Sequence, residues 1–270
     1  MGVLNVTPDS FSDGGRFLSE SDALRHAETL VREGTDIIDI GGESSRPAGP
    51  YGAGAKCVSI EEETRRTAPV IEAVARRFDT PISVDTVKSE VARAAIDAGA
   101  SAVNDISGLD GDPRMLEVVA SSGVSIFIMH MQGTPGTMQQ APRYRNLLRQ
   151  ISSYLKTGAE RALSAGVSPD RVAIDPGLGF GKSYEDNYKI IAHLTDFRDL
   201  GYPILIGPSR KTFVGIDFNL PPDQREEGSL AAFAMCAMAG ANIIRVHDVQ
   251  AARRALFVAD NVRARSITAK

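Results

Sequence analysis

Short apolar runs recur along the chain, and most of them follow a glycine that ends an amphipathic stretch. Six of these units contain the runs at residues 37–40, 102–105, 126–130, 172–175, 204–207 and 243–247. Glycine suits the left-handed conformation that follows a helix, and a short continuous apolar run is typical of a strand buried on both faces. The pattern therefore predicts helices that alternate with parallel strands.

Two further runs, at residues 3–6 and 81–84, bring the number of predicted strands to eight. Each is followed by a stretch that can form a helix. Eight such units in a chain of 270 residues predict a (β/α)8 TIM barrel, and no linker or charge run divides it, so we expect one domain over residues 1–270. An open, doubly wound α/β sheet would give the same alternation, with a reversal of strand order that a sequence does not show.

The second predicted helix shows the local pattern most clearly. Ser59 is followed three residues later by Glu62, which predicts a capping box at the start of the helix. Val70, Val74 and Phe78 recur at helical spacing, and we expect them to cover the barrel wall.

Composition narrows the functional classes. Hydrophobic residues make up 43% of the chain, charged residues 24%, and the formal net charge is −4. No stretch is long and apolar enough to cross a membrane, and the slightly acidic balance gives no support to nucleic-acid binding. Cys57 and Cys236 lack metal or redox spacing, and no secretory signal precedes the first strand, so we expect a cytoplasmic protein without membrane or nucleic-acid partners.

Polar residues stand at the carboxyl ends of the predicted strands. They are Asn5, Asp39, Asp85, Asn104, Asp175, Lys211, Arg245 and His247. In a TIM barrel these ends form the catalytic face, so the side chains converge on one mouth. Any one of them could be a helix cap or a satisfied buried group, but together they make a poor core, because each would need a desolvated partner. The set predicts an active site.

Eight short motifs are distributed along the chain, at residues 1–15, 41–47, 83–86, 103–108, 129–135, 175–182, 209–212 and 245–248. They occur in the order found in dihydropteroate synthases, and the sequence closely resembles that family over nearly its whole length. The resemblance implies a folate-pathway transferase that joins 6-hydroxymethyl-7,8-dihydropterin diphosphate to p-aminobenzoate. The implied products are 7,8-dihydropteroate and diphosphate. The implied cofactor is Mg²⁺, and the implied path is dissociative.

The family's binding residues carry over to matching positions of this sequence. The implied pterin-binding residues are Asp85, Asn104, Ile106, Met129, Asp175, Phe180, Gly207 and Lys211. The implied p-aminobenzoate-binding residues are Ser45, Arg46, Pro47, Phe180, Lys211 and Thr212. The implied diphosphate-binding residues are Asn5, Arg245 and His247, with the Asn5 oxygen also a magnesium ligand.

The resemblance also implies roles in the reaction. The expected catalytic residues are Asp85, Asp175, Lys211, Arg245 and His247. Arg245 and His247 would stabilise the departing diphosphate. Our hypothesis is that Asp85 and Asp175 stabilise a pterin cation, while Lys211 contacts the pterin and shapes the p-aminobenzoate site.

Two loops after the first strands are rich in Ser, Pro, Gly and Asp, and the resemblance predicts that residues 7–15 and 44–56 close over the substrates as lids. Residues 48–56 look longer than the corresponding loop in many family members. One hypothesis is that this extension alters the discrimination between p-aminobenzoate and sulfonamides, the expected competitive inhibitors; a surface insertion without effect is an equal alternative. The family further suggests a homodimer, with the helix near residues 228–238 as an interface.

Two other functions remain open at this stage. A pterin-binding methyltransferase on a similar barrel would share the pterin-facing Asp and Asn residues, but it has no need for cations that bind diphosphate. A catalytically silent pterin-binding protein would be expected to lack at least one strand-end group, and none is substituted here. The four histidines include no metalloprotease pair, so zinc is not expected.

Overall fold

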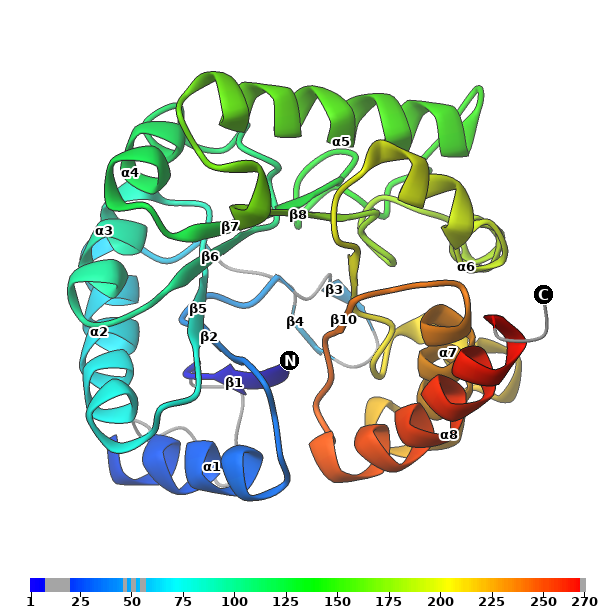
Figure 1. Ribbon diagram of the computed structural model, residues 1–270, viewed down its shortest axis with the longest axis horizontal. Coiled ribbons are helices and arrows are strands. Elements are labelled where there is room, and N and C mark those ends of the chain that lie inside the picture. Colours follow the sequence, from blue (N-terminus) through cyan, green and yellow to red (C-terminus); the bar gives the residue numbers. More distant parts are fainter. Residues whose placement is uncertain (8–19, 46–47, 50–51, 54–56, 268–270) are drawn as a thin grey trace.

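Eight parallel strands form the wall of a closed barrel in a computed structural model of the chain, which describes residues 1–7, 20–45, 48–49, 52–53 and 57–267. Helices surround the barrel (Figure 1). The barrel strands are β1 (Gly2–Asn5), β2 (Ile38–Gly41), β5 (Ile82–Asp85), β6 (Ala102–Asp105), β7 (Ser125–Met129), β8 (Val172–Asp175), β9 (Leu205–Ile206) and β10 (Ile243–Ile244). The predicted TIM barrel is confirmed.

Closure of the barrel depends on two isolated parallel bridges. Six strands pair in the order β1-β2-β5-β6-β7-β8, and β9 pairs with β10. Ile174 bridges to Ile204, which joins β8 to β9, and Gly2 bridges to Val246, which joins β10 to β1. The backbone N–H of Val3 also donates to the carbonyl of Val246 over 3.0 Å. These bridges exclude the open, doubly wound sheet.

The helices follow the strands as expected. They are α1 (Glu20–Arg32), α2 (Ile60–Arg77), α3 (Ser89–Asp97), α4 (Met115–Ser122), α5 (Leu147–Ser164), α6 (Tyr184–Ala192), α7 (Glu226–Met238) and α8 (Val249–Ile267). Short 3-10 helices are η2 (Pro169–Arg171), η3 (Leu194–Leu200), η4 (Thr212–Val214), η5 (Ile216–Phe218) and η6 (Pro222–Gln224). No helix within the described ranges combines the length and hydrophobicity that a membrane span requires.

Three local predictions need correction. The last two barrel strands are shorter than the apolar runs that predicted them, and Pro208, which cannot donate to a ladder, follows the first of these runs. The segment after β2 contains an unpredicted antiparallel pair, β3 (Ala48–Gly49) and β4 (Gly52–Ala53). Helix α7 begins at Glu226, two residues before the expected start.

The capping box predicted at the start of α2 is only half formed. The Ser59 hydroxyl accepts from the backbone N–H of Glu62 over 3.2 Å. The Glu62 carboxylate instead binds Arg65 and Arg66, because two nearby guanidinium groups compete for it. Elsewhere in the second helix the prediction is correct, since Val70 and Val74 are buried in the core.

Two apolar clusters fill the fold. The larger lies between the barrel wall and the helices. The smaller comes from strand positions of the opposite parity, which therefore point into the barrel, and its members are Met1, Ala102, Phe127, Ala173 and Leu205. Two positions further along their strands, the same inward parity reaches Asn104, Asp175 and Gly207. The alternation thus places polar residues above an apolar floor, at the carboxyl end of the barrel.

Candidate active site

A row of residues in register crosses four neighbouring strands at the mouth of the barrel. Asn5 is paired with Gly41, Gly41 with Asp85, and Asp85 with Asn104. Gly41 contributes no side chain to this row, and a Cβ atom there would crowd its neighbours, at 3.3 Å from the Asp85 Cβ and 3.7 Å from the Asn5 Oδ1. The row therefore presents an amide oxygen and a carboxylate on either side of a glycine.

Asp39 connects two of the predicted subsites. Its Oδ2 accepts from Arg245 Nε over 2.6 Å and from Asn104 Nδ2 over 3.2 Å, while its Oδ1 accepts from the Ser83 hydroxyl over 2.5 Å. Arg245 also donates through Nη2 to Asp85 Oδ2 over 2.8 Å. The structure thus brings Asp85, Asn104 and Arg245 into one network. Sequence reasoning named Asp39 only as a strand-end residue and missed that it holds this network together.

The shared guanidinium determines the charge state of this network. Burial raises the pKa of Asp85 to about 7; Arg245 opposes the shift, and the nearby Asp39 carboxylate adds to it. Burial lowers the pKa of Arg245, but the two carboxylates outweigh burial and the net shift is upward. One guanidinium therefore serves two carboxylates, and Asp85 changes its charge near neutral pH.

The opposite side of the mouth is built on the loop after β8. Asp175 Oδ1 accepts from the backbone N–H of Gly177 over 2.6 Å. Lys211 Nζ lies 4.1 Å from the centre of the Phe180 ring and donates to the carbonyl of Leu178. The predicted residues Asp175, Phe180 and Lys211 are therefore brought together, mainly through backbone groups.

Burial also shifts the pKa values of the charged groups on the β8 side of the mouth. It lowers the pKa of Lys211 to about 7, an effect that the carboxylate of Asp175 opposes. It raises the pKa of Asp175, which the Gly177 N–H and Lys211 oppose. The charges of Asp85 and Arg245 also act on Lys211, so the two sides of the mouth are electrostatically connected.

His247 is oriented by a residue that sequence reasoning assigned no role. The Ser209 hydroxyl lies 2.9 Å from His247 Nδ1, and its oxygen accepts from the His247 backbone N–H over 3.2 Å. Donation of the hydroxyl proton to Nδ1 leaves the ring proton on Nε2. In that tautomer Nε2 can donate to an anion; the place of Ser209 in the motif at 209–212 was the only sequence signal for it.

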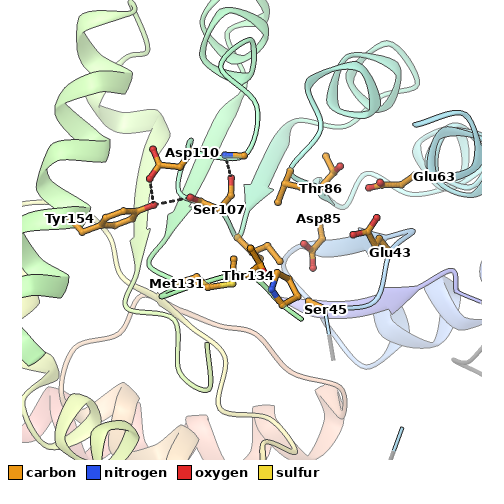
Figure 2. A pocket seen from close by; sticks show the side chains of 15 residues that line it. Glu43, Ser45, Glu63, Asp85, Thr86, Ser107, Asp110, Met131, Thr134 and Tyr154 are labelled. Carbon is orange, nitrogen blue, oxygen red and sulfur yellow. Dashed lines mark hydrogen bonds between the residues drawn. The ribbon is translucent and has the colours of Figure 1, made fainter. Parts of the chain in front are cut away.

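A cavity of about 310 Å³ opens between the loops after β2, β5, β6 and β7. Figure 2 shows Glu43, Glu63 and Asp85 on one side of it. Ser107, Asp110 and Tyr154, joined by hydrogen bonds, lie on the other. Among the predicted site residues Ser45, Asp85 and Ile106 line this cavity.

The two glutamates of this cavity share one lysine. Lys88 Nζ donates to Glu43 Oε2 over 2.5 Å, to Glu63, and to the carbonyl of Val58 over 2.8 Å. Burial lowers the pKa of Lys88, but the hydrogen bonds to both carboxylates outweigh burial, and the net shift is upward. Sequence reasoning missed this cluster, although Glu43 lies within the motif at 41–47.

The remaining predicted site residues are less closely connected. Gly207 lies beside Arg245, since a Cβ on the glycine would be 3.4 Å from the arginine Cβ. Met129 is buried at the end of β7, and Thr212 is exposed at the start of η4. Arg46, Pro47 and the predicted lids at residues 8–15 and in most of 44–56 lie outside the described residues.

Asn5 has the character expected of a magnesium ligand that acts together with substrate. Its side chain makes no hydrogen bond within the described part of the chain, and its Oδ1 lies beside Gly41. No group of three His, Cys, Asp or Glu residues placed to hold a metal occurs in the same part of the chain. Magnesium commonly takes one or two protein oxygens and completes its shell with phosphates and waters, so the residues present fit that ion.

Comparison with known proteins identifies the family. The sequence profile described as "Pterin binding enzyme" matches residues 1–247. The chain is 46% identical over 260 residues to the dihydropteroate synthase of Escherichia coli, covering 96% of this chain and 90% of that protein. The chain belongs to the dihydropteroate synthase family of pterin-binding enzymes. The predicted family and the predicted enzyme class are confirmed.

Solved structures agree with this family assignment. The dihydropteroate synthase of Yersinia pestis, in a sulfonamide drug complex, matches with a TM-score of 0.91 and 44% identity, covering 97% of this chain and 93% of that one. The dihydropteroate synthase of Xanthomonas albilineans with 4-aminobenzoic acid matches with a TM-score of 0.88 and 44% identity, covering 97% of this chain and 92% of that one. Family and fold therefore agree over nearly the whole length.

Proposed function

We propose that this protein condenses 6-hydroxymethyl-7,8-dihydropterin diphosphate with p-aminobenzoate to give 7,8-dihydropteroate and diphosphate. The observation that carries the proposal is the Asp39 network, which links the carboxylate of Asp85 and the amide of Asn104 to the guanidinium of Arg245. In this proposal, the groups that bind the pterin ring edge would lie directly beside a cation for the diphosphate.

Polar groups from both sides of the mouth would bind the pterin through hydrogen bonds. A pterin edge carries adjacent donors and acceptors, which the carboxylates of Asp85 and Asp175 and the amide of Asn104 can pair with. Ile106, Met129, Phe180 and Gly207 would supply apolar walls, and Lys211 would contact the ring. Lys211 and Phe180 also border the p-aminobenzoate site.

Departure of diphosphate requires positive charge where negative charge develops. Arg245 and His247 would bind the leaving oxygens, with the His247 Nε2 proton directed by Ser209. Magnesium, held by Asn5 and the substrate phosphates, would supply further neutralisation of the leaving group.

The bond changes follow a dissociative order in this proposal. The carbon–oxygen bond breaks first, and its electron pair leaves with diphosphate. Asp85 and Asp175, both carboxylates in a largely buried site, would stabilise the pterin cation that remains. The amine of p-aminobenzoate then attacks the cationic carbon, forms the carbon–nitrogen bond and releases one proton.

Sulfonamides would compete with p-aminobenzoate at Ser45, Arg46, Pro47 and Thr212, together with Phe180 and Lys211. A sulfonamide is bound in the matching Yersinia pestis structure, which supports this expectation. Whether the extension at residues 48–56 alters discrimination is tested by trimming it and comparing inhibition and substrate constants. An unchanged ratio of the two constants would reject that hypothesis.

A homodimer through α7 and α8 is part of the proposal. These helices carry exposed apolar side chains at Met235, Met238, Phe257, Val258 and Val262. A single-domain monomer rarely exposes so many large apolar groups on adjacent helices. Sedimentation analysis of Phe257→Glu beside the wild type tests the proposed dimer. A wild-type dimer that becomes monomeric in the variant agrees with the proposal, and a wild-type monomer contradicts it.

A cytoplasmic location is proposed together with the folate pathway, and cell fractionation tests the location.

The decisive experiment measures diphosphate release from dihydropterin diphosphate by purified protein with magnesium, with and without p-aminobenzoate, and identifies the product by mass. Release coupled to dihydropteroate formation would establish the synthase. Tight pterin binding without release would instead point to a methyltransferase or to a silent pterin-binding protein.

A further inference from the structure

Lys182 is among the largest fully buried side chains of the described residues, and its ammonium nitrogen lies within hydrogen-bond distance of one ring nitrogen and two backbone carbonyls. Its Nζ donates to His130 Nδ1 over 3.0 Å, to the His130 carbonyl over 3.1 Å and to the Phe180 carbonyl over 2.9 Å. Burial lowers the pKa of Lys182 well below its usual value. Placing a lysine here is costly, so its hydrogen bonds require an explanation beyond filling space.

Lys182 belongs to a larger arrangement around residues 178–181. The four consecutive carbonyls of this segment each accept a hydrogen bond from a different side chain. The donors are Lys211 to Leu178, Gln139 to Gly179 over 2.6 Å, Lys182 to Phe180, and Tyr144 to Gly181 over 2.6 Å. Such a segment has little freedom to rotate any of its peptide groups.

The loop after β7 packs against the residues that precede this segment. The backbone N–H of His130 donates to the carbonyl of Asp175 over 2.9 Å. At Gly177, where φ is +71°, a Cβ atom would lie 2.0 Å from the His130 carbonyl oxygen, so the two backbones are in direct contact. Lys182 reaches back across this contact and binds both polar groups of His130 that face it.

His130 extends the connection to a third loop. Burial, followed by the charge of Lys182, lowers the pKa of His130 to about 3, so its ring is neutral and Nδ1 accepts from Lys182. The ring packs edge-on against Tyr154, with centroids 5.0 Å apart. The Tyr154 hydroxyl donates to the Ser107 carbonyl in the loop after β6. Lys182 therefore contacts the loops after β7 and β8 directly, and the loop after β6 through His130 and Tyr154.

We infer that Lys182 is a positioning residue, which holds residues 178–181 so that the Phe180 ring and the Leu178 carbonyl orient Lys211 toward the substrates. The inference deepens the proposed synthase function and rests on it for the kinetic consequences. Lys182 does not reach the reacting atoms in this account; it acts through Phe180 and Lys211.

Kinetics of Lys182→Met test the role. We expect the KM for p-aminobenzoate to rise about tenfold, while the KM for dihydropterin diphosphate changes much less, because Phe180 and Lys211 border the amine site. Lys189→Met, the same substitution at an exposed position of α6, is the matched control and is expected to leave both constants unchanged.

A double-mutant cycle separates positioning from general destabilisation. If Lys182 acts through Phe180, then adding Lys182→Met to Phe180→Ala should raise the KM for p-aminobenzoate no further. Independent, additive effects, or equal increases in both substrate constants, would overturn the inference. Should Lys182→Met fail to fold, Gln139→Leu removes the adjacent donor from an exposed position; a KM for p-aminobenzoate unchanged in that variant would equally overturn it.

Hydrogen–deuterium exchange gives a readout that does not require activity. Lys182→Met is expected to speed exchange of the amides in residues 177–182 at least tenfold, roughly the effect of losing one buried hydrogen bond, with α3 unaffected. Unchanged exchange contradicts the inference. A wild-type protein that makes no dihydropteroate would defeat the proposed function, while the exchange result would still decide whether Lys182 holds the segment.

Discussion

The two sides of the barrel mouth hold their carboxylates in different ways. On the side of β2, β5 and β10, Asp39 and Asp85 are held by the side chains of Ser83, Asn104 and Arg245. On the side of β8, Asp175 is held by a backbone N–H, and the nearby Lys211 by a backbone carbonyl. On the first side the charged groups are held by other side chains, whereas on the second they are held by backbone groups, whose positions depend on the backbone conformation.

The difference predicts different responses to change. A network of side chains reorganises when one of its charges is removed or protonated, since the remaining buried charges lose their partners. A segment fixed by backbone hydrogen bonds responds chiefly to changes in conformation. Substitutions on the two sides should therefore separate effects on charge from effects on geometry.

The largest effect is expected for Asp85→Asn, which removes the charge and keeps the shape. We expect kcat to fall about 100- to 1000-fold, because the variant cannot stabilise a developing cation. Pterin affinity, measured by calorimetry, should change far less. Equal losses in turnover and affinity would show that Asp85 only binds the pterin.

Asp39→Asn should produce a smaller but broader loss. It leaves Arg245 with one carboxylate and disturbs Asn104, so the KM for dihydropterin diphosphate should rise about tenfold and the free energy of unfolding fall by about 3 kcal/mol. Ser83→Ala, the matched control, removes one hydrogen bond to the same carboxylate and should cost about 1 kcal/mol. Denaturant titration measures both, and equal costs would refute the central position of Asp39.

The pH dependence of activity compares one titrating group from each side of the mouth, Asp85 and Lys211. The proposed mechanism requires ionised Asp85 and protonated Lys211, and burial brings the pKa of each group to about 7. The rate should therefore peak near neutral pH and fall about tenfold per pH unit on either side. Lys211→Arg retains a positive charge at high pH, so its alkaline limb should be absent. An alkaline limb of unchanged position would assign that limb to another group.

Stability should depend on pH through Asp85 in a defined direction. The folded protein keeps this proton to about pH 7, whereas the unfolded chain releases it near pH 4, at about the ordinary value for aspartate. The contribution of Asp85 to stability is thus fully present below about pH 4 and lost as pH rises through 7. Thermal melts across this range should show wild type losing stability relative to Asp85→Asn, and parallel curves would contradict the shift.

The smallest effect is expected for Ser209→Ala. The variant loses the hydroxyl that sets the His247 tautomer but keeps the imidazole. The KM for dihydropterin diphosphate should rise about two- to fivefold, in keeping with the loss of one neutral hydrogen bond. Initial-rate kinetics measure it. A loss as large as that of His247→Ala would mean that Ser209 itself contacts the substrate.

Sequence patterns could predict the side of the mouth formed by β2, β5 and β10, because its functional groups are side chains whose residue types stand at strand ends. Asp85, Asn104 and Arg245 follow apolar runs, and alternation within a strand places them inside the barrel. The link through Asp39 was missed, because a periodic pattern gives the direction of a side chain and not its partner.

The β8 side was less accessible to sequence reasoning. Asp175 and Lys211 were recognisable, but the carbonyls that hold Lys211 and Lys182 belong to the main chain, whose hydrogen bonds do not depend on residue type. The positive φ angles of Gly177, Gly179 and Gly181 give this segment its course. Several glycines in succession signal a special conformation without specifying which one.

Gly41 separates Asn5 from Asp85 by contributing no side-chain atoms. Its φ angle does not require glycine, but a Cβ atom would crowd the Asp85 Cβ at 3.3 Å. Any larger residue would therefore displace the Asp85 carboxylate from its place in the Asp39 network. Under selection by an inhibitor, a change at this position should consequently weaken catalysis as well, because it cannot leave Asp85 undisturbed.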